Sequence, residues 1–283
     1  MKHELASVLV TGASRGLGAA TVAGFLAAGW RVAAVARDSA SLAAVAQAHP
    51  GRVLVIGDDL ADPAAAERIV AAVRAEWPRL DALINNAGIQ GPMGPLWTTG
   101  DSDWEQVLRI NLLAPIALCR AFVPWMQTTG GGSIVNLSGG GATGPRGYFA
   151  PYAASKAALV RVTETLAEEC AGTGVRVNAV APGAINTAML DEVLAAGPEK
   201  AGAKEYLAAT RRKEQGGDDP ERAAACIRWL AGPESAPITG RLISAVWDRW
   251  EGLHDRAKEL ATTDIYTLRR VSAKDRGKSW DPV

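Results

Sequence analysis

Short runs rich in valine, isoleucine and leucine alternate along the chain with longer, alanine-rich segments in which apolar residues recur at helical spacing. The predicted strands are residues 7–11, 31–36, 52–57, 81–86, 133–138 and 175–181. The predicted helices are residues 17–28, 41–48, 63–77, 102–126, 152–171 and 220–231. An alternation of this kind folds as a parallel sheet with helices on both faces. The sequence therefore predicts an α/β protein with a doubly wound parallel sheet in three α/β/α layers.

The length of the chain favours a single domain with a C-terminal extension. Its 283 residues, 48% of them hydrophobic, suffice for one large core. We expect the domain to span residues 1–243, with a flexible polar loop at about residues 184–219. The extension, residues 244–283, contains three tryptophans: Trp247, Trp250 and Trp280. Exposing them is unfavourable, so the extension is expected to pack on the domain or at a subunit interface.

The balanced charge argues against several classes of partner. Thirty basic residues match thirty acidic ones, so neither nucleic acid nor an anionic membrane is an expected partner. The N-terminal stretch lacks the layout of a secretory signal, and no apolar run approaches the roughly 18 residues of a membrane span. A cytoplasmic protein is expected. The three cysteines lack metal-ligand spacing and are expected to be reduced and buried, so no metal site is predicted.

A glycine-rich turn, TGASRGLG at residues 11–18, follows the first predicted strand and opens the first predicted helix. Gly12, Gly16 and Gly18 permit a tight turn and a close approach of the backbone to a pyrophosphate, whose charge then faces the helix N-terminus. A glycine triplet alone is a weak signal. The strand before it and the helix after it are the context that the motif requires, and they predict a Rossmann-type dinucleotide-binding fold.

Three further motifs accompany this turn: NNAG at 85–88, YAASK at 152–156 and PGAINT at 182–187. Over about residues 5–240 the set resembles the short-chain dehydrogenase/reductase (SDR) family in content, order and spacing. The resemblance implies an oxidoreductase that interconverts a carbonyl and a secondary alcohol on a small or medium-sized organic molecule. It also implies a homodimer or homotetramer. A dimer is preferred because the chain reads ITGRLISAVWDRW where family members commonly end in a short strand and Val-Asp-Gly-Gly.

The end of the second strand indicates which nicotinamide cofactor is used. Enzymes that choose NAD usually place an acidic residue there, which bonds the ribose hydroxyls. Here Ala36 is followed by Arg37. Arg37 can form a forked pair with the 2′-phosphate of NADP(H), and Arg15 can reach the same place. NADP(H) is therefore favoured over NAD(H), although Asp38 could turn inward and keeps NAD(H) open.

The resemblance implies the remaining cofactor contacts. They are Gly12, Ser14, Gly16, Leu17, Gly18, Asp59, Leu60, Asn86, Ala87, Gly88, Tyr152, Lys156, Pro182, Gly183, Ile185 and Thr187. Asp58 is the alternative to Asp59 for bonding the adenine. After PGAINT, the apolar residues Met189, Leu190, Leu194, Tyr206 and Leu207 either cover the substrate or form the packing face of their own segment.

Tyr152 and Lys156 are four residues apart on a predicted helix, so both side chains lie on one face, about 6 Å apart along the axis. A free phenol has a pKa near 10, which is high for proton exchange around neutrality. At an effective dielectric near 20, an ammonium about 4 Å away is expected to lower that pKa by about three units before solvent screening is deducted. In the family, the tyrosine is the general acid and base, and the lysine also bonds the nicotinamide ribose. Asn111 matches the family asparagine that anchors a water behind the lysine.

The serine of the family's catalytic set is ambiguous in this chain. Family members commonly place it 13 residues before the tyrosine, where this chain has Gly139, and Ser138 stands one residue earlier. Either the glycine-rich loop at 139–141 absorbs the extra residue and Ser138 takes the role, or no serine holds the substrate oxygen. We expect the first, because glycine permits the bulge.

Two other functions are compatible with the motifs. One is a 3-oxoacyl-[acyl-carrier-protein] reductase, although the balanced charge offers no basic patch for the carrier. The other is a non-catalytic NADP(H)-binding sensor or scaffold. Retention of Asn111, Tyr152 and Lys156 argues against the sensor.

Overall fold

Seven parallel strands form one sheet in the part of the chain that the computed structural model describes, residues 5–280. Their order across the sheet is β3-β2-β1-β4-β5-β6-β7. The strands are β1 (Ser7–Thr11), β2 (Arg31–Ala36), β3 (Val53–Gly57), β4 (Ala82–Asn85), β5 (Gly132–Leu137), β6 (Val175–Ala181) and β7 (Leu242–Ser244). The predicted doubly wound parallel α/β fold is confirmed. Residues 1–4 and 281–283, the outer ends of the predicted domain and extension, lie outside the described residues.

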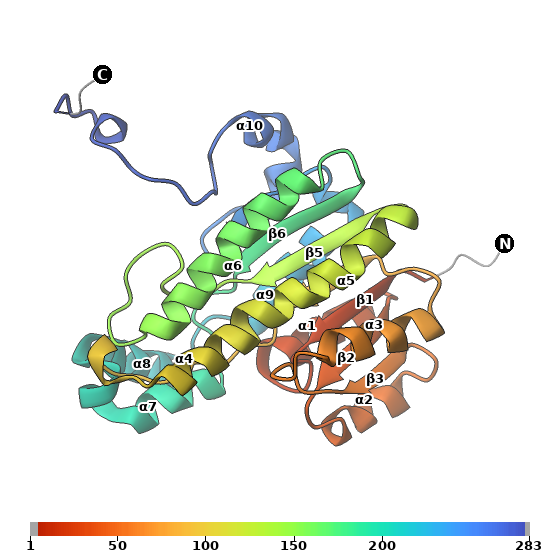
Figure 1. Ribbon diagram of the computed structural model, residues 1–283, viewed down its shortest axis with the longest axis horizontal. Coiled ribbons are helices and arrows are strands. Elements are labelled where there is room, and N and C mark those ends of the chain that lie inside the picture. Colours follow the sequence, from red (N-terminus) through yellow and green to blue (C-terminus); the bar gives the residue numbers. More distant parts are fainter. Residues whose placement is uncertain (1–4, 281–283) are drawn as a thin grey trace.

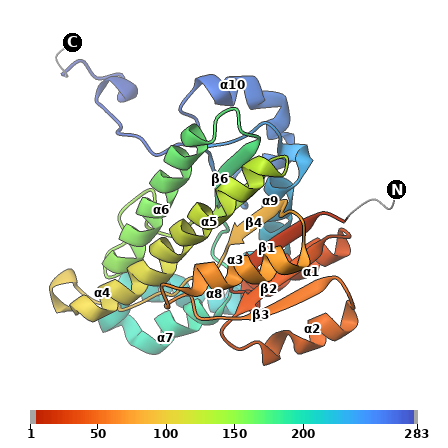
Figure 2. The same cartoon turned by 45° about the vertical axis from the view of Figure 1, so that its right-hand side comes forward.

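Helices cover both faces of the sheet (Figures 1 and 2). One face packs against α1 (Gly16–Ala27) and α9 (Pro220–Ala231). The other packs against α3 (Ala65–Glu76), α5 (Ala114–Thr128) and α6 (Ala150–Glu169). Two short helices, α2 (Ala43–Ala48) and α10 (Ala257–Thr262), lie at the margins of the layers.

Successive residues of each central strand point to opposite faces of the sheet and pack in the hydrophobic core on that face. In β1, Val8 and Val10 pack with α1 and α9, whereas Leu9 packs with the helices of the other face. Val8 is paired with Val32 of β2 and Ala82 of β4, so it has a strand on each side as well. A strand enclosed in this way requires apolar side chains on both faces, which is why the runs are continuously hydrophobic.

The strand order reverses between β1 and β4. From β1 the chain adds β2 and β3 on one side, and then returns to place β4 to β7 on the other. The loops that leave β1 and β4 therefore diverge, and a crevice opens beyond the carboxyl ends of these strands. This topology brings the glycine turn and the NNAG motif together.

A long helical run precedes β5. It consists of α4 (Asp101–Leu108), one π-helical turn (Arg109–Leu113) and α5. Among residues 5–280, this run is the segment that is long and apolar enough to cross a membrane by length and composition alone. Half of its apolar window is buried, and α5 packs on the sheet beside α3. Its hydrophobicity is therefore accounted for by the core.

The predicted polar loop at 184–219 is largely helical. It contains α7 (Ala188–Ala201) and α8 (Ala203–Gln215), which lie side by side near the N-terminal ends of α4 and α6 (Figures 1 and 2). Gly202 separates them with a φ of 78°, a conformation that glycine adopts without strain. The carboxylate of Asp219 then caps α9 by accepting from the backbone of Glu221.

The C-terminal extension packs only in part. Trp250 is buried against Trp229 of α9, with ring centroids 5.7 Å apart. Trp247 and Trp280 remain 83% and 76% exposed. Trp250 thus lies against the domain, and a subunit contact through the other two tryptophans stays a prediction.

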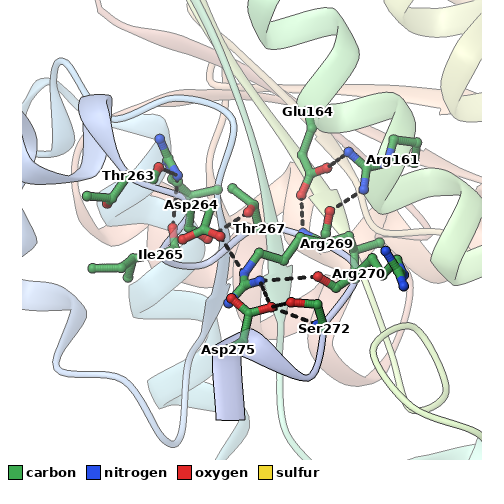
Figure 3. Close-up of polar contacts among 12 residues, drawn as sticks. Arg161, Glu164, Thr263, Asp264, Ile265, Thr267, Arg269, Arg270, Ser272 and Asp275 are labelled. Atoms are coloured by element: carbon green, nitrogen blue, oxygen red, sulfur yellow. Dashed lines mark hydrogen bonds and ion pairs between the residues drawn. The ribbon is translucent and has the colours of Figure 1, made fainter. Parts of the chain in front are cut away.

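Beyond α10 the extension crosses the outer surface of α6 (Figure 3). The backbone N–H of Leu268 donates to Glu164, and the carbonyl of Leu268 accepts from Arg161. Arg269 forms ion pairs with Asp264 and Asp275 inside the extension. These contacts hold one short stretch against α6, after which the chain leaves the body of the protein (Figure 1).

Candidate active site

The glycine turn adopts the conformation that its motif predicts. Gly12 and Gly16 have φ values of 65° and 54°, which favour glycine. Gly18 is required for a different reason, because a Cβ there would lie 2.0 Å from the carbonyl oxygen of Gly12. The turn leads into the N-terminus of α1, whose first turn has no acidic residue. Free amide groups and a positive helix end suit a pyrophosphate.

Asn86 binds the glycine turn to the end of β4. Its Nδ2 donates to the carbonyl oxygens of Thr11, at 2.8 Å, and Gly12, at 3.2 Å. The hydroxyl of Thr11 accepts in return from the backbone N–H groups of Asn86 and Ala87. A Cβ on Gly12 would lie 2.9 Å from the Cα of Ala87, so the two loops touch. This contact fixes the floor of the crevice.

The two arginines expected at the 2′-phosphate lie on one rim of the same cleft. Arg15 and Arg37 are exposed, and within residues 5–280 neither guanidinium has a hydrogen bond or ion pair. The carboxylate of Asp38 accepts a hydrogen bond from the backbone N–H of Ala40 at 3.0 Å. The arrangement leaves two cations free to bind an anion at the end of β2.

At the adenine end, the structure distinguishes the two neighbouring carboxylates. Asp58 accepts from Arg68 at 2.7 Å and 2.9 Å. Asp59 has no ion pair among the described residues, and its carboxylate accepts only from the backbone of Ala61. Leu60 is buried beside them. Asp59 is therefore the carboxylate available for an adenine amino group.

Asn111 lies in the π-helical turn and is fully buried. Its Oδ1 accepts from the N–H of Ile89 at 2.8 Å, and its Nδ2 donates to the carbonyl of Ile89 and to the Ser155 hydroxyl. A Cβ on Gly88 would lie 3.2 Å from Asn111 Oδ1 and 3.5 Å from Lys156 Nζ. Both side chains therefore approach the backbone of the NNAG motif at Gly88. A π turn inside an α-helix often marks a functional site.

Tyr152 and Lys156 lie on one face of the first turns of α6, as their spacing predicts. The amine of Lys156 is buried, donates to the carbonyl of Leu137 at 2.8 Å, and lies 5.8 Å from the centroid of the Tyr152 ring. The tyrosine hydroxyl lies against the loop after β5, because a Cβ on Gly139 would be only 2.3 Å from it. Neither side chain faces bulk water.

Ser138 stands at the end of β5 with its hydroxyl buried and without a hydrogen-bond partner among the described residues. Its backbone N–H donates to Val180, which continues the sheet by one residue. Position 139 has no room for a serine side chain beside the Tyr152 hydroxyl. A buried, unpaired hydroxyl needs a partner, so Ser138 is suited to bind a substrate oxygen.

Burial favours the neutral forms of both Tyr152 and Lys156. It raises the pKa of Tyr152 above its ordinary value, and the charge of Arg146 opposes this rise. It lowers the pKa of Lys156 to about 8. The expectation that Lys156 lowers the pKa of Tyr152 by about three units is therefore wrong for this structure. The reason is that removing a phenolate from water is the largest effect on Tyr152, while the Lys156 amine lies 5.8 Å from the ring centroid and is itself fully buried.

This lowered pKa makes the stability contribution of Lys156 depend on pH. Between about pH 8 and the ordinary pKa of an unfolded lysine, the unfolded chain binds more protons than the folded one, so stability rises with pH across that window. We expect Lys156→Met to raise the free energy of unfolding at pH 7 by about 2 kcal/mol, allowing about 1 kcal/mol for the lost hydrogen bond. The gain should shrink as the pH approaches 10.

Denaturant unfolding at pH 7 and pH 10 tests this prediction. The exposed Lys258 of α10 offers the matched control, and Lys258→Met should leave the stability unchanged at both pH values. Equal destabilisation of Lys156→Met at pH 7 and pH 10 would contradict the argument.

The segment after β6 is held by a residue that the motifs did not identify. Asp218 accepts from the backbone of Ala184 at 2.5 Å and returns its own N–H to the Ala184 carbonyl at 3.1 Å. Gly183 has a φ of 93°, and a Cβ there would lie 2.7 Å from the Asp218 carboxylate. Thr187 reaches the glycine turn, since its Cγ2 would lie 3.4 Å from a Cβ on Gly16. The PGAINT loop thus closes over the crevice.

All of these features belong to one cleft with a volume of about 1430 Å³. Every residue predicted for the site lines it except Asn111, which lies behind its wall. Of the apolar residues expected near the substrate, Met189 and Leu190 line the cleft, and Leu194 packs against the cluster that contains Phe149 and Val193. Tyr206 is half-buried and Leu207 is exposed, and neither lines the cleft. The two alternatives for this group each hold for some of its members.

Arg146, Glu205 and Gln90 also line the cleft and were not predicted. Arg146 and Glu205 form an ion pair although 59 residues separate them. Gln90 follows NNAG-Ile directly, is buried, and has no partner for its Nε2 among the described residues. Its position just after the NNAG motif was the one signal in the sequence for any of these three.

Comparison with known proteins agrees with this geometry. The family model described as short chain dehydrogenase matches residues 6–197. The short-chain reductase protein NovJ of Streptomyces niveus is 36% identical over 239 residues, which cover 83% of this chain and 90% of NovJ. The 3-oxoacyl-[acyl-carrier-protein] reductase FabG of Thermotoga maritima is also 36% identical, over 86% of this chain and 97% of its own length.

Among solved structures, the KRED1-Pglu enzyme superposes with a TM-score of 0.78 at 28% identity, covering 84% of this chain and 99% of its own. The similarity thus extends across the sheet and the cleft. The chain belongs to the short-chain dehydrogenase family, whose members are oxidoreductases that bind NAD(P)(H).

Proposed function

We propose that this protein is an NADP(H)-dependent oxidoreductase that interconverts a carbonyl and a secondary alcohol on a small or medium-sized organic molecule. The observation that carries the proposal is the convergence on one cleft of the glycine turn, Arg15 and Arg37, and Tyr152 beside the buried hydroxyl of Ser138, where neither the guanidinium groups nor this hydroxyl have a partner within residues 5–280. A cofactor site alone would not require a tyrosine and a serine at the end of β5. The sensor or scaffold function is therefore not favoured.

The residues of the chain divide the chemistry among them. When bound, the nicotinamide supplies the hydride for reduction or accepts it in oxidation. Tyr152 gives its proton to the carbonyl oxygen during reduction and takes it back in the reverse direction. Ser138 donates to the same oxygen and holds it beside Tyr152. Lys156, buried beside the backbone of Gly88, binds the nicotinamide ribose.

The glycine turn and its neighbours are proposed to bind the rest of the cofactor. The pyrophosphate would lie at the N-terminus of α1, against the backbone of the turn and beside Ser14 and Leu17. The adenine would bond to Asp59 and pack on Leu60. The backbone of Pro182 and Gly183, with Ile185 and Thr187, would hold the carboxamide.

The preference for NADP(H) rests on Arg15 and Arg37 and can be measured directly. We expect the protein to oxidise NADPH faster than NADH with any carbonyl substrate that it accepts. Arg37→Ala should weaken NADPH binding about tenfold and leave NADH binding nearly unchanged, because only the former has a 2′-phosphate to pair with the guanidinium. Equilibrium titration with both nucleotides is the measurement. Arg222 of α9 lies outside the cleft, and Arg222→Ala is the control.

A screen of ketones, aldehydes and alcohols that follows nicotinamide absorbance tests the function itself. Faster consumption of NADH than of NADPH would contradict the assignment of Arg15 and Arg37. The similarity to the Thermotoga maritima reductase makes 3-oxoacyl thioesters the second class to include. Activity confined to carrier-bound 3-oxoacyl chains would replace the general carbonyl reductase by that narrower enzyme.

Members of the family often form oligomers. We propose a homodimer formed through α5 and α6, the helices that follow Asn111 and carry Lys156. The extension already lies across α6 at Arg161 and Glu164, so it would belong to that contact. Sedimentation velocity distinguishes a dimer from a tetramer.

A further inference from the structure

The loop between β5 and α6 places an arginine over the two aromatic rings at the start of α6. The guanidinium carbon of Arg146 lies 3.8 Å from the centroid of the Phe149 ring and 5.8 Å from that of Tyr152. The amine of Lys156 lies 5.8 Å from the same Tyr152 centroid. Tyr152 therefore has two cations at equal distance, one from its own helix and one from the loop.

Glu205 in the first turn of α8 holds this arginine in place. Its Oε2 accepts from Nε and Nη2 of Arg146, both at 2.9 Å. The two side chains are only 16% and 24% exposed, so the pair is shielded from solvent more than an ordinary surface ion pair. It joins the loop beside Tyr152 to one of the two helices that line the cleft.

The other surroundings of Tyr152 are mostly apolar. Phe149, Leu190 and Val193 pack in its cluster, and burial raises the pKa of the Tyr152 hydroxyl while Arg146 opposes that rise. On the facing segment, the other charged residues that line the cleft are Asp191 and Glu192 of α7, Arg212 and Lys213 of α8, and Asp218. Lys213 is neutralised by Asp191 at 2.7 Å, and Asp218 is bound to the backbone of Ala184.

We propose that Arg146 is a positioning residue that stabilises the ionised form of Tyr152, and that Glu205 tunes this effect by holding the guanidinium to α8. The inference rests on the proposed function, in which Tyr152 exchanges a proton with the substrate oxygen. The inference assigns a second cation to Tyr152, from a residue outside the predicted catalytic set. The pKa of the tyrosine would then depend on the position of α8 over the cleft. A unit charge about 6 Å from a phenolic oxygen shifts its pKa by about half a unit even with water-like screening, and Arg146 lies 5.8 Å from the centroid of the ring that carries this oxygen.

Four variants test the proposal. Arg146→Met removes the cation, Arg146→Lys keeps a charge without the forked pair, and Glu205→Gln removes the counter-charge. Lys213→Met is the matched control. Like Arg146→Met, it removes a cation that an ion pair holds in place, but this cation belongs to α8. Two measurements are made: the pH profile of kcat/KM for alcohol oxidation, and the ultraviolet titration of Tyr152, obtained as the difference from the same protein carrying Tyr152→Phe.

Alcohol oxidation requires an ionised Tyr152, so kcat/KM rises with pH through its pKa. We expect Arg146→Met to move this rise to higher pH by at least about half a unit, and Glu205→Gln to move it to lower pH. In Arg146→Lys, kcat/KM should rise at nearly the same pH as in the parent, while KM increases. Lys213→Met should leave the profile in place. The ultraviolet titration should shift in the same directions.

An unmoved profile in both Arg146→Met and Glu205→Gln, with only KM or thermal stability altered, would show that the pair is merely structural and overturn the proposal. Shifts of both variants in the same direction would overturn it as well. If Tyr152→Phe proved as active as the parent, the proposed function would fail instead. The ultraviolet titration would then still decide whether Arg146 controls the acidity of Tyr152, because it needs neither substrate nor turnover. Should Arg146→Met not fold, Glu205→Gln and Arg146→Lys carry the same test.

Discussion

Replacing Tyr152 by phenylalanine is expected to lower kcat by about 10²- to 10⁴-fold while leaving nucleotide binding nearly unchanged. The change removes one hydroxyl and keeps the ring, which is buried against Phe149 and Leu190. What is lost is the proton that must reach the substrate oxygen as hydride arrives at carbon. Steady-state oxidation of NADPH gives kcat, and equilibrium titration gives the affinity for the nucleotide.

Tyr148 provides the matched control for this change. It lies four residues earlier in the chain, in the loop before α6, and its side chain is exposed and packs on Gly202 outside the cleft. Tyr148→Phe should therefore retain the kcat of the parent. Full activity of Tyr152→Phe on any substrate that the protein accepts would remove Tyr152 from the chemistry.

Gly139→Ala is expected to reduce kcat by at least about 10²-fold, because small displacements of a reacting group have effects of that size. An added Cβ would lie 2.3 Å from the Tyr152 hydroxyl and 3.0 Å from its ring carbon Cζ, so the tyrosine or the loop must move. Overpacking of this kind also lowers the free energy of unfolding, typically by about 1–3 kcal/mol. Kinetics and thermal unfolding of the same variant measure both effects.

The neighbouring glycine is the control. A Cβ on Gly140 would meet its nearest atom, Cδ of Arg146, at 3.6 Å, which is an ordinary contact. Gly140→Ala should therefore change kcat little. Gly139→Ser introduces the residue that family members commonly carry at this distance from the tyrosine, and it should impair the enzyme for the same steric reason. An active Gly139→Ser variant would show that the loop relaxes, and that Ser138 is not the only position from which a hydroxyl can reach the substrate oxygen.

The fold was accessible from local patterns. Central strands of a parallel sheet are buried on both faces, so their apolar runs are visible in the sequence without any knowledge of their neighbours. The glycines of the first turn are likewise constrained by their own backbone, as the φ values of Gly12 and Gly16 confirm. The loop at 184–219 was less accessible, because α8 is polar and because Leu190 and Val193 of α7 are buried through tertiary contact with the start of α6.

The electrostatics of the site were not accessible in the same way. The spacing of Tyr152 and Lys156 correctly places them on one face of a helix, but it contains no information on burial. Burial decides the sign of the pKa shift of Tyr152 and brings Lys156 to about 8. The choice between Asp58 and Asp59 likewise depends on Arg68, whose partner cannot be identified from spacing alone.

By itself, the sequence determined the parallel α/β architecture, the nucleotide turn and the identity of the residues at the ends of β4, β5 and β6. These features depend on backbone conformation and on the periodicity of apolar residues, which are properties of short stretches of chain. Only the tertiary structure decided that Ser138 has an unpaired buried hydroxyl, that Gly139 must lack a side chain, and that Arg146 and Glu205 meet beside Tyr152. The physical reason is that solvation and charge act through space, between segments that folding brings together from distant parts of the chain.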